Sequence, residues 1–257
     1  MTSYERRQSI IQLLQKQPGI RVSELSKALE VTKGTIRNDL DVLKDEGILT
    51  RVHGGAVLGK QPVCFGASIG TRYLEQPESK LAIAQKTAEL IADGDSILLD
   101  ASTTVYYLAQ QLENRHHLRI VTNGIDVARL LAKDSTNMVV LLGGIVNTDG
   151  SSVTGSLSEQ IIRDLHVQKA FVSCSGLSLK RGLTDVLLAE AELKGKALSS
   201  AREVFALVDS SKIGKEDLTS FASTDQITHL YTDENLSAEW AAQLEQAHIA
   251  YTICKTD

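Results

Sequence analysis

The residues best suited to reading a nucleic-acid sequence lie together near the start of the chain. Arg37 and Asn38 are adjacent, and Lys33 and Thr35 shortly precede them. An arginine can form two hydrogen bonds with guanine and an asparagine two with adenine, whereas lysine and threonine suit contacts with phosphate. We therefore expect Arg37 and Asn38 to read base edges, and Lys33 and Thr35 to contact the DNA backbone.

A second group of residues has the chemistry to bind a small anionic ligand. Five consecutive residues follow a short apolar run and lead into a predicted helix: Asp100, Ala101, Ser102, Thr103 and Thr104. Hydroxyl groups and free backbone N–H groups at the start of a helix form a natural phosphate site. The same residue types are ordinary caps in most strand-to-helix loops, so this pattern alone leaves both interpretations open.

Other strand ends add polar or glycine residues to the same predicted edge of a sheet. Asn123 follows one predicted strand, and Gly143 and Gly144 follow another. Asp209 and Lys212 follow a third, where a carboxylate can accept hydrogen bonds from sugar hydroxyls and an ammonium can hold a phosphate. A solvated loop lysine is an equally weighted alternative for Lys212. We expect these residues to share one ligand site, because open α/β sheets bind ligands beyond the carboxyl ends of their strands.

Three helices are predicted to position Arg37 and its neighbours. Apolar residues recur with helical period between positions 4 and 16, and Pro18-Gly19 ends that helix. Ser23 is expected to cap a second helix and Thr32 a third, since their hydroxyls can accept hydrogen bonds from free N–H groups. Both are also expected to lie at the DNA interface. Two short helices around a tight turn, the second with a polar exposed side, are typical of a helix-turn-helix.

A glycine-rich hairpin is predicted to follow the third helix. Residues 48–52 form one strand and 56–58 the returning strand. The residues at the tip are His53, Gly54 and Gly55. Glycines let the backbone approach DNA closely, and Arg51 with His53 suits contacts with phosphate or the minor groove. A simple exposed histidine stays open as the alternative for His53. The hairpin completes a winged helix.

The rest of the chain alternates predicted strands and helices. Strands are predicted at 96–100, 119–122, 138–142, 170–173, 204–208, 229–231 and 250–253, with helices at 80–92, 104–112, 126–132, 158–164, 187–201 and 238–246. This alternation predicts an α/β protein: a small N-terminal winged helix-turn-helix and a larger, doubly wound, mostly parallel α/β domain. The expected boundaries are 1–58 for the head, 59–77 for a linker and 78–257 for the body.

Charge is unevenly distributed along the chain. The net charge of −5 argues against nucleic acid by itself. Residues 1–60, however, hold ten Lys and Arg against seven Asp and Glu, and the remainder holds 17 against 25. A basic head on an acidic body is expected when only the head touches phosphates. A solvated basic face gives the same surplus, so charge supports the DNA interpretation without deciding it.

Cysteine usage and hydropathy exclude several other classes of protein. Cys64, Cys174 and Cys254 are widely spaced and form no cluster with histidine, so we expect reduced thiols, no metal site and no cofactor. The N-terminus lacks a signal-peptide pattern, and no run approaches the ~18 apolar residues needed to cross a bilayer. We therefore expect a cytoplasmic protein without a membrane partner.

The head resembles the deoxyribose-operon repressor (DeoR) family, whose pattern is close to V-x-E-L-A-x-x-L-x-V-S-x-x-T-I-R-R-D-L-x-x-L-E-x-x-G-x-L-x-R-x-H-G-G-A. The matching residues are Val22, Glu24, Leu25, Leu29, Val31, Thr35, Ile36, Arg37, Asp39, Leu40, Leu43, Gly47, Leu49, Arg51, His53, Gly54, Gly55 and Ala56. The chain departs at Thr32, where a serine is usual, and at Asn38, where the family usually has a second arginine. The resemblance implies DNA binding, and Asn38 is expected to give this chain an operator preference different from that of other family members.

The body resembles the sugar-phosphate-sensing domain of the same family, which is similar in fold to ribose-5-phosphate isomerase. The match covers roughly residues 80–215, and it implies that Gly176 and Lys194 join the effector site. Ala101-Ser102 replaces the usual pair of a small residue and glycine, and Ser175 stands where an aspartate is frequent. Both departures lie near the implied site, so the particular sugar and its phosphorylation stay open.

Together the two halves predict a sequence-specific transcriptional regulator that is not an enzyme. We expect a repressor of a carbohydrate-utilisation operon, controlled by a sugar phosphate and binding double-stranded operator DNA as a homodimer or homotetramer. The alternative is a sugar-phosphate isomerase with an appended basic domain. Related isomerases carry acidic residues where residues 170–176 have none, which favours the regulator. A DNA-binding protein with a vestigial body is a third possibility, and it predicts operator affinity indifferent to sugar phosphates.

Overall fold

The computed structural model describes residues 3–16, 19–45, 49–52, 55–58, 72–73 and 75–256. The chain divides into two units, residues 1–71 and 72–257. Most of the expected linker, 59–77, lies outside the described residues, so the boundaries 1–58 and 78–257 stay predictions. The first long helix of the second unit, α5 (Pro77–Ala88), begins where the linker was expected to end.

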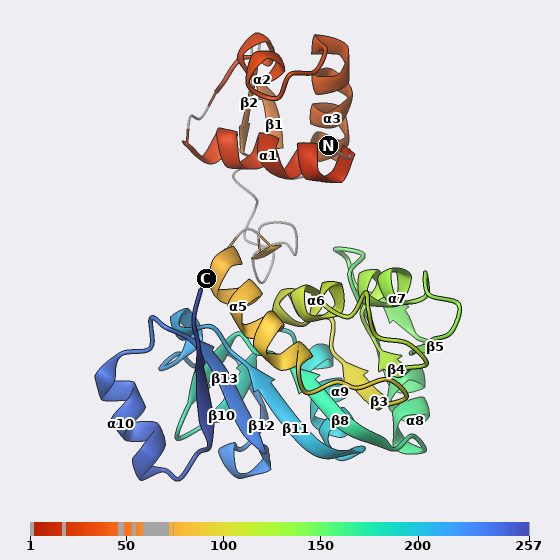
Figure 1. The fold of residues 1–257 in the computed structure, drawn as a ribbon, viewed down its shortest axis with the longest axis vertical. Coiled ribbons are helices and arrows are strands. Elements are labelled where there is room, and N and C mark those ends of the chain that lie inside the picture. The colour runs from red at the N-terminus through yellow and green to blue at the C-terminus, as the bar shows by residue number, and fades with distance from the viewer. Residues whose placement is uncertain are drawn as a thin grey trace. The chain divides into compact units, whose positions relative to one another are not determined.

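The described part of the first unit is a three-helix bundle with an antiparallel hairpin (Figure 1). Its elements are α1 (Ser3–Lys16), α2 (Val22–Ala28), α3 (Lys33–Asp45), β1 (Leu49–Val52) and β2 (Gly55–Leu58). Its core contains fully buried side chains from each helix, namely Ile10, Leu14, Leu25, Ile36 and Leu40. The sequence predicted each of these elements because apolar side chains at helical spacing must face one core.

The two predicted helix caps have different outcomes. Thr32 caps α3 as expected, since its Oγ1 accepts a hydrogen bond from the N–H of Thr35 at 3.1 Å. The prediction for Ser23 is wrong: α2 begins earlier, and Arg21 occupies the N-cap position. The backbone N–H of Arg21 donates to a carboxylate oxygen of Glu24 at 2.9 Å. A glutamate in the first turn thus satisfies the N-cap backbone, and Ser23 lies inside the helix.

The described part of the second unit is built on a seven-stranded parallel sheet in the order β14-β13-β11-β8-β3-β4-β5 (Figure 1). Its strands are β3 (Ser96–Leu99), β4 (Arg119–Thr122), β5 (Met138–Leu141), β8 (Val167–Val172), β11 (Ala201–Leu207), β13 (His229–Asp233) and β14 (Tyr251–Cys254). Every neighbouring pair is parallel, which confirms the predicted α/β class. The chain order reverses between β3 and β8, where such sheets bind ligands.

Helices cover both faces of this sheet. One apolar cluster packs beneath α5, α6 (Thr103–Gln110) and α7 (Ile125–Leu131). The other packs beneath α8 (Ser156–Arg163), α9 (Leu188–Leu198) and α10 (Ala238–Gln246). Side chains along β8 alternate between the two clusters, with Phe171 in the first and Val172 in the second. Both clusters are therefore parts of one layered α/β domain.

Two small antiparallel sheets were not predicted from the sequence. One contains β12 (Thr219–Ala222), β10 (Gly182–Asp185) and β9 (Gly176–Ser178), and the other contains β6 (Ile145–Val146) and β7 (Val153–Thr154). These strands have two to four residues, too few for a period to be recognised. They matter for function because they bring side chains from distant loops to the carboxyl ends of the large sheet.

Candidate nucleic-acid interface and ligand site

One side of α3 carries the residues predicted to meet DNA. Lys33, Arg37 and Asn38 are exposed, whereas Ile36 and Leu40 on the opposite side are fully buried. This separation follows from the helical period, because residues three or four apart share a face. The helix therefore offers an arginine and an asparagine side by side to a partner, which is the arrangement that base-edge reading requires.

Thr35 differs from its exposed neighbours. It is half-buried, and its Oγ1 lies 2.9 Å from Oγ1 of Thr32 at the helix start. Either hydroxyl can donate, so each keeps lone pairs for other partners. A phosphate contact by Thr35 stays a prediction.

An ion pair joins α3 to α1 on the inner side of the helix. Nε of Arg6 lies 2.5 Å from Oδ2 of Asp39, and Nη2 of Arg6 donates to Oδ1 at 3.2 Å. Asp39 is buried. Because its carboxylate is neutralised and turned toward the core, its negative charge is kept away from the face that carries Arg37.

The predicted wing is described only in part. Arg51, in β1, is half-buried and its Nη2 lies 3.0 Å from Oδ1 of Asp41 on α3. Gly55 is the first residue of β2. His53 and Gly54 lie outside the described residues. The DNA contacts expected of Arg51, His53 and the two glycines stay predictions.

In the second unit, Asp100 organises the loop between β3 and α6. Its Oδ1 accepts hydrogen bonds from the N–H and Oγ of Ser102 at 2.9 and 2.5 Å. Its Oδ2 accepts from the N–H of Ser173, which follows β8, at 2.9 Å. Asp100 therefore links the two strand ends at the reversal of chain order. Ser102 also accepts from Val105 at 3.3 Å, so it caps α6, whose first residue, Thr103, is buried.

Lys194 lies buried behind this loop, among three oxygen acceptors. Its Nζ lies 3.1 Å from Oδ2 of Asp100 and donates to Oδ2 of Asp185 and the carbonyl of Ser173 at 2.8 and 3.0 Å. Burial alone would lower the pKa of Lys194, but the carboxylates of Asp100 and Asp185 outweigh burial and raise it. The ammonium thus donates two hydrogen bonds and forms an ion pair with a further carboxylate. Lys194 thus holds three strand ends together, and direct contact with an effector stays a prediction.

Two further lysines, Lys212 and Lys80, lie near Asp209, which follows β11. Nζ of Lys212 lies 3.2 Å from Oδ2 of Asp209 and donates to Oγ of Ser173 at 3.3 Å. Lys80 of α5 is buried in the same region. Burial, and then the charge of Lys212, lower the pKa of Lys80 to about 8. The ammonium groups of Lys80 and Lys212 lie near Asp209, and each has the charge to bind an anion.

Two side-chain oxygens near the carboxyl ends of β3 and β11 have unused hydrogen-bonding capacity. Oγ1 of Thr104, in the first turn of α6, and Oδ2 of Asp209 are buried and make no hydrogen bond within the described residues; Oγ1 of Thr232 in β13 is a third such atom. The Asp209 oxygen is near Lys212 but not in hydrogen-bond geometry. Because an unpaired buried polar group is costly, a ligand that supplies partners is favoured here.

Two glycines predicted for the ligand site are explained by close packing. A Cβ on Gly144, whose φ is +144°, would lie 2.4 Å from the carbonyl oxygen of Thr154. A Cβ on Gly176 would lie 2.5 Å from the carbonyl oxygen of Lys215. Neither distance is possible for a real side chain, so both positions require glycine for the fold itself. Contact of either glycine with a ligand stays a prediction.

The remaining predicted ligand residues lie beside the β6–β7 hairpin or the neighbouring loop. The carbonyl of Asn123 accepts from the first backbone N–H of β7 at 2.9 Å, and the carbonyl of Gly143 accepts from Oγ of Ser158 at 2.5 Å. Ala101 packs against the next loop, since a Cβ on Gly124 would lie 3.1 Å from its Cα. Asp100, Ser102, Lys194 and Lys212 are thus brought together around Ser173, whereas Asn123 and Gly143 lie to one side.

Comparison with known families separates the chain into the same two units. A model of the DeoR-like helix-turn-helix domain matches residues 6–61, and a model of the DeoR C-terminal sensor domain matches residues 75–234. The chain belongs to the DeoR family. This confirms the resemblance carried by the motifs of the head and the body.

Curated relatives of this DeoR-family chain match along nearly its full length. It is similar to the HTH-type transcriptional regulator GolR of Listeria innocua, at 35% identity over 99% of this chain and 100% of the relative. It is also similar to the lactose phosphotransferase system repressor of Streptococcus mutans, at 38% identity over 91% of this chain and 93% of the relative. This DeoR-family chain is therefore a transcriptional regulator and not an isomerase, the alternative considered from the sequence.

Solved structures with some likeness include ribose-5-phosphate isomerase A of Methanocaldococcus jannaschii, with 18% identity and a TM-score of 0.38 over 52% of this chain and 53% of the other. Another is eIF2B delta of Chaetomium thermophilum, with 14% identity and a TM-score of 0.41 over 77% and 62%. Likeness at this level does not bear on activity.

The described residues contain neither a group of three His, Cys, Asp or Glu side chains placed to hold a metal ion nor a helix long and apolar enough to span a membrane.

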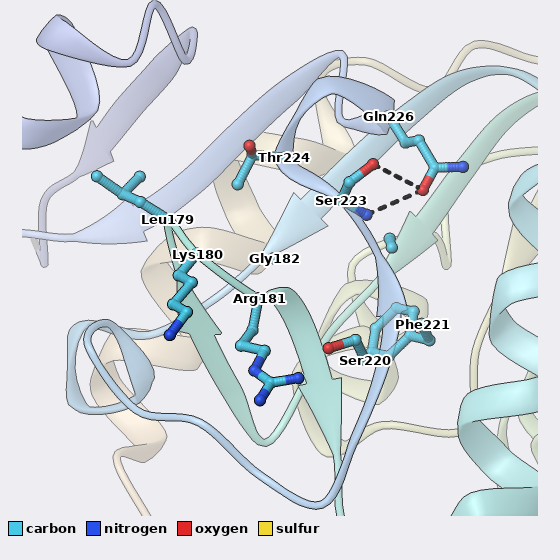
Figure 2. Close-up of a pocket in the computed structure, with 10 residues that line it drawn as sticks. Leu179, Lys180, Arg181, Gly182, Ser220, Phe221, Ser223, Thr224 and Gln226 are labelled. Atoms are coloured by element: carbon cyan, nitrogen blue, oxygen red, sulfur yellow. Dashed lines mark hydrogen bonds between the residues drawn. The ribbon is translucent and has the colours of Figure 1, made fainter.

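A depression of about 360 Å³ lies beside the turn between β9 and β10 (Figure 2). Lys180 and Arg181 line it together with Ser223, whose N–H and Oγ both donate to Oε1 of Gln226. None of the predicted effector residues lines this depression, so it is separate from the ligand site.

Sequence reasoning missed three residues that shape the ligand site. Lys80 starts the predicted helix 80–92, but nothing in its spacing showed that α5 buries it near Lys212. Asp185 lies at the end of β10, one of the short strands that the sequence did not reveal. Glu190, on α9, is buried and accepts hydrogen bonds from Asn147, at 2.7 Å, and from Oγ of Ser152 in the β6–β7 hairpin.

Proposed function

We propose that this DeoR-family regulator represses genes of carbohydrate use in the cytoplasm, and that a sugar phosphate bound at the carboxyl ends of β3, β8 and β11 controls its binding to DNA. The names of relatives that match most of the chain, lactose phosphotransferase system repressors among them, support a target in carbohydrate use. The class of effector rests on one observation, the placing of two ammonium groups, that of buried Lys80 and that of half-buried Lys212, near each other.

The charges around this pair suit a phosphate group. The lowered pKa of Lys80 means that its protonated, charged form is destabilised, because the side chain is buried and lies near the charge of Lys212. A dianionic phosphate between them would remove this cost and form charge-assisted hydrogen bonds. Asp209 beside them is suited to accept hydrogen bonds from sugar hydroxyls, and the unpaired Oγ1 of Thr104 offers a further donor or acceptor.

Asp100 and Lys194 act one step behind the ligand in this proposal. Asp100 fixes the β3–α6 loop through Ser102 and the β8 end through Ser173. Lys194 forms ion pairs with both Asp100 and Asp185. A site assembled in this way needs little rearrangement when the ligand arrives, which favours tight and selective binding.

The head supplies the DNA side of the function. Arg37 and Asn38 would read base edges in the major groove, while Lys33 and Thr35 contact phosphates. Arg51 and the wing tip would contact the backbone or the minor groove beside the site. A ligand that favours one arrangement of paired subunits would shift the population between forms whose heads match the two half-sites and forms whose heads do not.

A thermal-shift screen of the full chain tests the effector class. The panel contains pentose and hexose phosphates, the same sugars without phosphate, and inorganic phosphate. A sugar phosphate at 100 times its dissociation constant should stabilise the protein by ~2.7 kcal/mol, and the unphosphorylated sugar should not. Lys212→Gln should abolish the shift, whereas Lys133→Gln, an exposed lysine on another loop, should preserve it.

The same screen is coupled to DNA binding by fluorescence anisotropy on an operator selected by the protein from a random-sequence pool. The stabilising sugar phosphate should change operator affinity by at least tenfold in wild type and not in Lys212→Gln. If the protein selects an operator whose affinity is indifferent to every sugar phosphate in the panel, the regulator stands and its proposed effector is wrong.

A further inference from the structure

The side of the second unit that ends in β5 exposes an extended apolar surface. Six large apolar side chains there are between 38% and 73% exposed: Met138, Leu141, Ile145, Val146, Leu157 and Ile161. They belong to β5, β6 and α8, and together they are called the β5–α8 surface below. Single exposed apolar side chains are normal on a soluble protein, but several on adjoining elements mark an interaction site.

Close packing makes this surface continuous. A Cβ on Gly143, between β5 and β6, would lie 3.8 Å from Cδ1 of Ile161 on α8. A Cβ on Gly155, just before α8, would lie 3.7 Å from Cδ1 of Ile145 on β6. Ile161 of α8 therefore lies against the loop between β5 and β6, and Ile145 of β6 lies against the residue before α8.

The helix α8 buries Ile162 completely but leaves two other large apolar side chains exposed. Leu157 and Ile161 are four residues apart and both exposed, whereas Ser158 is buried. The charged Glu159 is turned aside and pairs with Lys196 of α9. An amphipathic helix normally buries its leucine and isoleucine and exposes its serine. Leu157 and Ile161 thus form an apolar strip of α8 that its own unit does not cover.

The strand β5 adds an unprotected edge. The N–H groups of Met138 and Leu142 donate to the carbonyls of Leu118 and Thr122, so those of Val139 and Leu141 point to the open side of the sheet. Residues 138–148 contain no charged side chain and no proline. Natural edge strands usually carry charges, prolines or bulges that prevent pairing. An edge without them is one that another strand covers.

We infer that a second copy of this chain covers the β5–α8 surface, through a two-fold contact in which the β5 strands of the two copies lie antiparallel. Residues 61–257 hold 17 Lys and Arg against 25 Asp and Glu, so two bodies repel each other over most of their surface. An uncharged apolar surface is where two such bodies approach at least electrostatic cost. A two-fold contact uses the same surface on both copies, so one patch suffices. The choice of a second copy also rests on the proposed function, since a two-fold operator needs two heads.

Sedimentation equilibrium of the full chain tests this inference. The variants are Ile145→Lys and Leu157→Lys, on separate elements of the surface, and the control is Leu218→Lys, at an exposed leucine on a loop outside it. Each surface variant should raise the subunit dissociation constant by roughly 30-fold or more, as expected for the centre of an interface. The control should leave it unchanged. Circular dichroism checks folding, and Ile145→Ser serves as a milder variant with a smaller change in the same direction.

Hydrogen exchange provides a second readout of the same contact. The peptide that covers residues 138–142 should be protected in wild type and exchange faster in Ile145→Lys. A wild-type monomer at micromolar concentration, or an oligomer that both surface variants leave intact, would overturn the inference. A monomer that still binds a selected operator leaves the proposed function standing, whereas a stable dimer that selects no DNA sequence refutes the function and keeps the interface.

Discussion

Arg6 and Asp39 form a two-point ion pair that ties the first helix of the head to the helix that carries Arg37. Nε of Arg6 lies 2.5 Å from one carboxylate oxygen and Nη2 lies 3.2 Å from the other. Asp39 is next to Asn38 in the chain but on the opposite side of α3, where it is buried. The pair therefore fixes the angle at which α3 presents its exposed side, and it does so without touching that side.

Replacing Asp39 by asparagine should loosen the head and weaken its binding to all DNA. The variant removes the charge that Arg6 pairs with, so the thermal midpoint of the head should fall below that of wild type. Asp41→Asn is the matched control, because Asp41 is exposed and its pair with Arg51 is a surface pair worth less than about 1 kcal/mol. Equal midpoints for the two variants in differential scanning calorimetry would contradict the assigned role of Asp39.

Arg37→Ala and Lys33→Ala should separate base reading from backbone contact. Loss of Arg37 should cost ~1–3 kcal/mol on a selected operator and much less on random DNA, whereas loss of Lys33 should weaken both alike and reduce the salt dependence. Fluorescence anisotropy on the two DNAs at several salt concentrations measures this. Identical losses for Arg37→Ala on operator and random DNA would show that Arg37 contacts only phosphate.

Lys194→Met should destabilise the body by ~3–5 kcal/mol, because it leaves the buried carboxylates of Asp100 and Asp185 without their partner. Urea unfolding measures the loss. Lys196→Met is the control, since this lysine is on the same helix and exposed, and its loss should change stability little. If Lys194→Met kept full stability while losing effector binding, Lys194 would be a ligand contact rather than a positioning residue.

The affinity for a phosphorylated ligand should fall as pH rises through about 8. Lys80 loses its proton there, and with it the charge that holds the anion. A phosphate monoester is already dianionic above its second pKa near 6, so the ligand does not change over this range. Isothermal titration between pH 7 and about 9 measures the fall, which Lys80→Gln should remove. A pH-independent affinity in wild type would exclude Lys80 from the site.

Without ligand, the contribution of Lys80 to the free energy of unfolding should rise with pH, whereas its contribution to ligand affinity should fall. The pKa of Lys80 is about 8 in the folded chain and near 10.5 when unfolded, so the unfolded state binds the extra proton between these values. The contribution of Lys80 to the free energy of unfolding therefore rises with pH across this window and is lowest below pH 8. Comparing wild type with Lys80→Gln isolates this contribution from other groups.

The parts of the fold that the sequence predicted are those with a strong period or a dense motif. The helix around Arg37 and the strand before Asp100 were recognised because long apolar patterns report burial on one side. The helix cap at Ser23 was not predicted correctly, since the competing glutamate satisfies the backbone from within the first turn. The helix begins before Ser23, and the residue at which a helix begins is hard to place from a local rule.

Only some residues of the candidate ligand site could be predicted from the sequence, for a related reason. Asp100 and Lys212 follow strands that could be recognised, so their meeting at one sheet edge was predictable. Asp185 and Glu190 reach the site through a short strand and the start of a helix, and their contacts with Lys194 and Ser152 are between segments distant in sequence. Such pairings depend on the register of small antiparallel sheets, which no period reports.

The β6–β7 hairpin has two different neighbours on its two sides. Ile145 belongs to the β5–α8 surface, while Asn147 donates to Glu190 close to Lys194. If the proposed ligand binds near Lys194, it would change the electric field around Glu190 and act on the hairpin that a second copy would contact. Thermodynamic linkage is reciprocal. If ligand binding weakens the affinity between subunits, subunit pairing weakens the affinity for the ligand by the same factor. The number of regulator molecules in a cell would then help to set the amount of sugar to which its genes respond.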